Sequence, residues 1–225
     1  MAKSLVKHLK IDRPASMDYY VNIESAKDKD KFIKRIERIV RSSMEYRDYI
    51  QFLKENLDLN ACIFFNRVST IRSTNHHKIS IEQHHEPFTL YDIVSVILEK
   101  FIDSGEEIND LLIADEVLEL HYANMVGLVP LSKTAHQIIH NSDLLMVPLN
   151  MVYGNYSKFL EDYEAYIPDE LYDKLERKLE MTSKLTPESF DALVAEFKYY
   201  DVEGQEDIEK LELVDNMTEQ EVSVA

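Results

Sequence analysis

The sequence lacks any long uninterrupted apolar run. Its apolar stretches extend over only a few residues before a charge interrupts them, so none is long enough to cross a membrane. The first residues, MAKSLVKHLKIDRP, lack the apolar segment of a signal peptide. We therefore expect a soluble protein without membrane contacts, located in the cytoplasm.

Cysteine, glycine and proline are all scarce. The single cysteine, Cys62, cannot form an internal disulfide or a four-thiolate zinc site, which restricts any metal site to His, Asp and Glu. Only four glycines and six prolines, with many Leu, Ile, Glu and Lys, favour helices over a sheet-rich fold. Hydrophobic residues make up 45% of the chain, which is enough to bury a core.

Positive charge is scarce overall, and it is unevenly distributed. The net charge is −17, yet residues 1–80 contain 16 Lys and Arg against 10 Asp and Glu, whereas residues 81–225 contain 9 against 32. A basic surface in the first part could meet a polyanion while the acidic part meets something else. The acidic part could also be a solvated surface that serves solubility.

The apolar spacing predicts a helix-rich chain with a few short strands. Residues 28–58 show the three- and four-residue spacing of one long amphipathic helix, or of two helices broken near Ser42 and Ser43. The polar face of this segment is basic, and it could contact phosphates or be merely solvated. Its basic residues are Lys31, Lys34, Arg35, Arg38 and Arg41.

The middle of the chain alternates strand and helix signals. Short apolar or alternating stretches at residues 60–66, 78–82 and 125–131 suit strands. A helix follows Thr89, with Asp92 completing a capping box and Gly105 as the stop, and a second helical pattern ends near residue 124. Thr134 and Gln137 form another capping box, which predicts a short helix that carries His136 and His140.

We expect four regions along the chain. They are an N-terminal helical region with a basic face (1–59), a core that contains a helical insertion at about 87–122 (60–150), acidic C-terminal helices (151–203) and an acidic tail (204–225). Tyrosines at helical spacing in the third region suit amphipathic packing or an oligomer interface.

Four histidines attract attention because of their spacing. His136 and His140 are four residues apart on the expected helix, so both imidazoles can face one metal ion. His84 and His85 follow the expected strand at 78–82, and neighbouring side chains at a strand end point in different directions. Together the two pairs could supply three ligands and one further histidine. Each pair alone could equally be ordinary surface or core histidines.

The order IEQHH followed by GLVPLSKTAHQIIHN resembles the HNH, or ββα-metal finger, nucleases. The resemblance implies an α+β fold, mainly helical, with a small ββα core formed by short strands and the helix of His136 and His140. It also implies that His84, His136 and His140 bind one divalent ion, Mg²⁺, Mn²⁺, Zn²⁺ or Ni²⁺, and that His85 is the general base. The asparagine of the family pattern falls at Gly127, and Asn124 is a candidate for the same loop-anchoring role.

The function expected from this resemblance is a metal-dependent endonuclease that cuts or nicks duplex DNA. The resemblance would fit a phage origin, and the expected location is then the host cytoplasm. Arg67, Arg72 and Lys78 could hold flanking phosphates, and Glu82 and Glu86 could orient the imidazoles or be solvent-exposed. Two alternatives remain open: an inactive metal-finger binding protein, or a helical interaction protein whose acidic surface imitates nucleic acid. A protein partner for the acidic C-terminal region and a homo-oligomer are further expectations.

Overall fold

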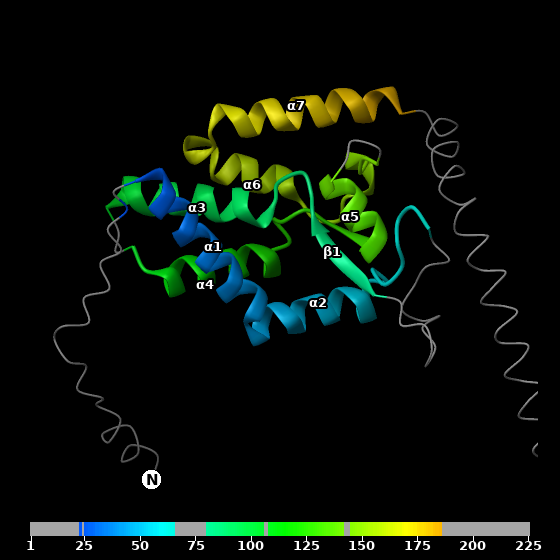
Figure 1. Ribbon diagram of the computed structural model, residues 1–225, viewed down its shortest axis with the longest axis horizontal. Coiled ribbons are helices and arrows are strands. Elements are labelled where there is room, and N and C mark those ends of the chain that lie inside the picture. The colour runs from blue at the N-terminus through cyan, green and yellow to red at the C-terminus, as the bar shows by residue number, and fades with distance from the viewer. Residues whose placement is uncertain (1–22, 24, 66–79, 106–107, 142–144, 186–225) are drawn as a thin grey trace, which may run out of the picture.

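The computed structural model describes residues 23, 25–65, 80–105, 108–141 and 145–185 (Figure 1). Within these residues the chain forms seven α-helices and one sheet of two strands, which confirms the predicted mainly helical α+β class. The elements are α1 (Ala26–Ser42), α2 (Met44–Asn56), β1 (Ile81–His85), α3 (Leu90–Ser104), α4 (Asp110–Tyr122), β2 (Leu128–Ser132), α5 (Lys133–Asn141), α6 (Tyr156–Asp162) and α7 (Asp169–Lys184), with short 3₁₀ turns at Leu149–Met151 and Glu164–Tyr166.

The break predicted near Ser42 and Ser43 separates α1 from α2. Ser43 has an extended backbone, so its amide closes α1 by donating to Ile39 and Val40, while its hydroxyl accepts from the amide of Tyr46 and begins α2. The two helices therefore diverge at one serine that caps both of them.

The helices α3 and α4 occupy the long connection between the two strands. Thr89 and Asp92 form the predicted capping box at the start of α3, and Gly105 ends the helix with a left-handed backbone (φ 68°). Both helices pack against α1, and their apolar residues form the main hydrophobic core with residues of α2, α6 and α7. The expected insertion at 87–122 thus supplies much of the core.

The sheet is a single antiparallel pair whose register places His84 opposite Val129 and His85 opposite Leu128. The helix α5 follows β2 directly, giving the order strand, strand, helix that the sequence predicts. A smaller hydrophobic cluster holds α5 against the strands; it contains Cys62, Phe64, Ile81, Val129, Leu131, Ala135, Leu145 and Val147. In Figure 1, β1 lies between α5 on one side and α2 on the other.

Two local expectations are wrong. Residues 60–65 form no continuous strand; the segment instead lies beside β2, with the amide of Ile63 donating to the carbonyl of Pro130 at 3.0 Å. Thr134 does not begin α5, because the helix starts at Lys133 and the hydroxyl of Ser132 accepts from the amide of Ala135. Ser132 is therefore the residue that caps this helix.

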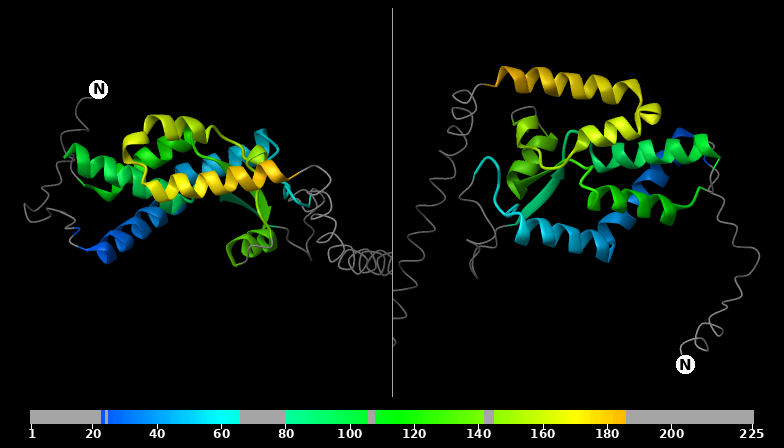
Figure 2. Two further views of the ribbon diagram at one scale, coloured as in Figure 1. Left: turned by 90° about the horizontal axis from the view of Figure 1, so that it is seen from above. Right: turned by 180° about the vertical axis from the view of Figure 1, so that it is seen from behind.

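The C-terminal helices cover one edge of the molecule. α7 lies along the edge opposite α2 in the front and rear views (Figures 1 and 2). The tyrosines of this part are partly buried and pack against the main core, as expected if their helical spacing serves amphipathic packing. They are Tyr153, Tyr156, Tyr163, Tyr166 and Tyr172. The end of the region expected to form acidic C-terminal helices, residues 186–203, and the acidic tail at 204–225 lie outside the described residues.

Candidate metal centre

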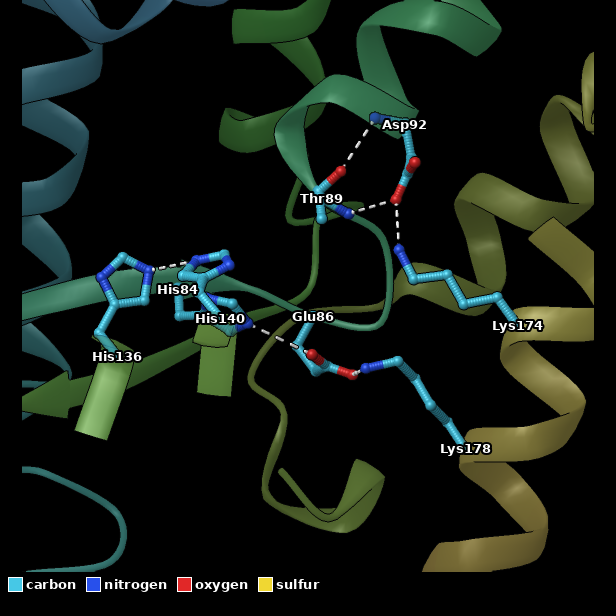
Figure 3. Close-up of polar contacts among 8 residues, drawn as sticks. All are labelled: His84, Glu86, Thr89, Asp92, His136, His140, Lys174 and Lys178. Atoms are coloured by element: carbon cyan, nitrogen blue, oxygen red, sulfur yellow. Dashed lines mark hydrogen bonds and ion pairs between the residues drawn. The ribbon is translucent and has the colours of Figure 1, made fainter. Parts of the chain in front are cut away.

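Three of the four singled-out histidines meet at one place. His84 on β1 and His136 and His140 on α5 each offer a ring nitrogen, and the three nitrogens all lie within 4.8 Å of one another. The ring centroids are 5.0 Å apart from His84 to each helix histidine and 4.6 Å apart between His136 and His140. Figure 3 shows the three rings turned toward one another. We call these residues the histidine triad.

Strand and helix periodicity together produce this convergence. Side chains two apart on a strand share a face, so Glu82 and His84 both face α5. Side chains four apart on a helix also share a face, which directs His136 and His140 to β1. His84 is only 5% exposed, whereas His140 lies at the surface. The triad therefore connects a buried strand to an exposed helix face.

Two carboxylates orient the imidazoles. Glu82 Oε2 lies 2.5 Å from Nδ1 of His136, and Glu86 Oε2 lies 3.4 Å from Nε2 of His84. A carboxylate accepts hydrogen bonds, so each of these ring nitrogens donates and the other nitrogen of a neutral ring carries the lone pair. In His136 that other nitrogen is Nε2, which lies 2.9 Å from Nε2 of His140 and accepts from it. Metal-binding histidines commonly have such a partner on the second nitrogen. The proposed orienting role of both glutamates is thus consistent with the geometry.

The environment lowers the pKa of two groups at this site, His140 and Glu86. Burial and the neighbouring imidazoles lower the pKa of His140. Burial alone would raise the pKa of Glu86, but the hydrogen bonds and charge supplied by His84 and Lys178 lower it overall. Lys178 on α7 is ion-paired with Glu86 Oε1, on the far side of the carboxylate from His84 (Figure 3).

His85 faces away from the triad. Its Nε2 lies 3.0 Å from Nε2 of His121 on α4, and its ring stacks on Tyr46 of α2. Nδ1 of His121 lies 2.6 Å from the carbonyl of Val117 and must donate to it, so Nε2 of His121 accepts from His85. Burial lowers the pKa of His121 to about 4 and that of His85 well below its usual value.

The remaining candidate residues divide into two groups. Arg67, Arg72 and Lys78 lie outside the described residues. Asn124 lies two residues after the end of α4 and has a positive φ of 59°. Its carbonyl accepts from the amide of Asn155 at 2.7 Å, so its backbone holds the loop before β2. On the basic face of α1, three side chains are already ion-paired within the chain: Lys31, Lys34 and Arg35.

Gly127 cannot be replaced by the asparagine of the nuclease pattern without rearrangement. A Cβ atom at this position would lie 1.9 Å from the carbonyl oxygen of Glu86 and 2.8 Å from a methyl carbon of Val152. The close approach allows the amide of Glu86 to donate to the carbonyl of Gly127 at 3.0 Å. The glycine therefore permits the pairing that continues the sheet just beyond His85.

Sequence reasoning missed three residues that complete this region. His121 carried no spacing signal, because it lies on a helix far from the other histidines in sequence. Lys174 and Lys178 are spaced as one face of a helix, but nothing local indicates that this face meets Asp92 and Glu86. Only the tertiary packing of α7 brings these charges together.

The comparison with family models identifies the kind of protein. Residues 4–223 match the model of the bacteriophage G278-like virion protein family, so the chain belongs to that family. No curated protein and no solved structure matches the chain.

This membership corrects the HNH assignment. The resemblance rested on two short stretches, IEQHH and GLVPLSKTAHQIIHN, whereas the virion protein family accounts for nearly the whole chain. The endonuclease prediction is wrong, and the two alternative functions give way to the family description as well; only the phage origin agrees with it. The ββα order was misleading because a strand pair followed by a short helix is a simple local arrangement that unrelated folds can share. The base role expected of His85 depended on the same resemblance.

Proposed function

We propose that the protein is a structural component of the phage virion in which one divalent metal ion fastens α5 to β1. The family description supports the virion role. The convergence of His84, His136 and His140 supports the metal site and is the observation that carries it. Among the described residues, no helix is long and apolar enough to cross a membrane. The cytoplasm is then the place of synthesis, and the virion is the final location.

The ligand set favours particular ions. Imidazole suits Zn²⁺ and Ni²⁺, whereas Mg²⁺ and Mn²⁺ prefer oxygen ligands. The nearby oxygens of Glu82 and Glu86 already accept from imidazoles, which leaves nitrogen as the donor atom of the triad. We therefore propose Zn²⁺ as the bound ion. It would add a third link between β1 and α5, beside the small hydrophobic cluster and the contact of Glu82 with His136.

The proposed partner is a neighbouring virion protein. Residues 81–225 carry 32 acidic against 9 basic residues, which gives a surface suited to a basic protein face. Binding to duplex DNA and self-association stay predictions.

Metal binding is tested with purified protein. The apo protein, prepared with a chelator and dialysed, is titrated with Zn²⁺ by calorimetry, and its thermal stability is measured with and without the ion. We expect one Zn²⁺ per chain and a higher melting temperature, because an ion at 1,000 times its Kd stabilises the folded state by about 4 kcal/mol.

A double variant, His136→Gln with His140→Gln, should lose both effects. Gln137→Ala on the same helix is the matched control, since Gln137 is exposed and outside the triad; it should behave as the wild type. Equal zinc binding by the double variant and the wild type would contradict the site.

A further inference from the structure

Glu86 joins the histidine triad to α7. One carboxylate oxygen faces Nε2 of His84 and the other is ion-paired with Nζ of Lys178, so a single side chain touches both (Figure 3). Glu86 is only 2% exposed, and its amide is fixed by the carbonyl of Gly127. Water therefore cannot readily replace either partner, and a loss at one oxygen leaves a buried charge poorly compensated.

A metal ion at the triad would act on this carboxylate through His84. A neutral imidazole can carry its proton on either nitrogen, and the Nδ1 form would turn a lone pair toward Glu86. Coordination through Nδ1 excludes that form and keeps a proton on Nε2, where it is donated to Glu86. The carboxylate is then held in the position in which its second oxygen meets Lys178.

The helix α7 makes few polar contacts with the other described parts of the chain. Lys174 pairs with Asp92 at 2.6 Å, Lys178 pairs with Glu86, and the amide of Leu149 donates to the hydroxyl of Thr182 at 3.3 Å. Only two of its residues, Leu171 and Leu175, are buried. The ion pair with Glu86 is thus a substantial part of what holds the second half of the helix.

We infer that Glu86 is a positioning residue that couples metal occupancy of the triad to the docking of α7. This inference rests on the proposed metal site. Coupling of this kind is reciprocal, so docking of α7 favours the metal-bound form as much as the metal favours docking. The C-terminal helix of the described chain would then be held most firmly in metal-loaded protein.

The structure provides an internal control. Lys174 lies one turn before Lys178 on the same face of α7, and its partner Asp92 also accepts from the amide of Thr89 at the start of α3. None of these contacts reaches the triad. Loss of Lys174 should loosen α7 to the same extent with and without metal, whereas loss of Lys178 should remove the response to metal.

The test is hydrogen exchange of the α7 amides in the full chain, measured with and without Zn²⁺. We expect zinc to slow this exchange about five-fold or more in the wild type, the lower range of typical coupling between sites. In Lys174→Met the α7 amides should exchange faster both with and without zinc, but zinc should slow the exchange by the same factor as in the wild type. In Lys178→Met the exchange rates with and without zinc should be equal. Lys178→Arg keeps the positive charge and should restore the slowing by zinc.

The outcomes separate this inference from the proposed function. Zinc uptake by the wild type without any change in α7 exchange overturns the coupling and leaves the metal site standing. An undiminished response in Lys178→Met also overturns it. Failure of the wild type to bind zinc overturns the metal site, and the coupling with it.

Discussion

At the scale of single residues, Gly127 allows two backbone segments to approach closely near the triad. Its missing side chain lets the amide of Glu86 reach the carbonyl of Gly127, which in turn fixes the carboxylate beside His84. The position is therefore sensitive to volume and not only to backbone conformation.

Replacing Gly127 by Ala should lower the free energy of unfolding by about 1–3 kcal/mol, since the new methyl group forces the backbone of Glu86 to move. Gly105→Ala is the matched control: Gly105 has a left-handed φ of 68°, but nothing lies within 4 Å of its Cβ position, so it should lose only about 1 kcal/mol. Urea denaturation measures both. Equal losses would show that the contact with Glu86 is unimportant.

The buried pair His85 and His121 makes stability depend on pH. The folded chain holds His121 with a pKa of about 4, against 6.5 for an ordinary histidine, so between these values the unfolded chain binds more protons. The free energy of unfolding should therefore fall as pH drops from 6.5 toward 4, and should be fully regained above 6.5.

Urea denaturation at pH 7.5 and pH 5, with chelator present to exclude metal effects, measures this loss. His121→Phe removes one of the titrating rings, so its stability should differ less between the two pH values than that of the wild type. An equal pH dependence in both proteins would mean that the ring of His121 does not contribute.

At the scale of elements, the helix ends were the most predictable features. The capping box of Thr89 and Asp92, the glycine stop at Gly105 and the break at Ser43 all involve residues within four positions of one another, so local chemistry decides them. The cap of α5 was misplaced because Ser132 and Thr134 are both good cap residues, and the strand register decides where the helix starts.

The candidate site could be predicted only in part, because sequence patterns report on residues that are close together in the chain. Periodicity showed that His136 and His140 share a face and that His84 and His85 diverge, which the structure bears out. Contacts such as those of Lys178 with Glu86 or His85 with His121 join residues far apart in sequence, and no local pattern encodes them. The functional class was missed because a short ββα motif says little about the whole chain.

Ser43 offers a test at this scale, because it ends one helix and begins the next. Ser43→Ala should lower the free energy of unfolding by about 1 kcal/mol, since the amide of Tyr46 loses its acceptor. Ser42→Ala is the control: the Ser42 hydroxyl only bonds back to the carbonyl of Ile39 at an exposed position, so its loss should change stability by about 0.5 kcal/mol or less. Chemical denaturation compares the two, and a larger effect at Ser42 would contradict the capping role.

At the scale of the whole molecule, one main core unites helices from both ends of the described chain. Residues of α1 and α2 share it with Leu171 and Leu175 of α7, although about 130 residues separate them in sequence. The described part of the chain should therefore unfold as one cooperative unit, with α7 included.

Leu175→Ala should lower the free energy of unfolding by about 2–3 kcal/mol, because Leu175 is 9% exposed and packs in the main core. Leu179→Ala, one turn further along α7 and 49% exposed, should change it little. Thermal denaturation followed by circular dichroism would show a single shifted transition for Leu175→Ala. A separate early transition, with the main transition unmoved, would mean that α7 unfolds on its own.

The separation of the two strands by residues 86–127 also bears on the order of events during folding. The helices α3 and α4 lie in this long connection, and pairing of the strands requires its two ends to come together. Closing such a loop loses chain entropy before the strand contacts form, so strand pairing should be slow. His136 and His140 can meet within one short helix, but His84 joins them only after the strands pair. Tight binding of the ion proposed for this site would therefore depend on completed pairing of the strands, because the third imidazole joins the other two only then.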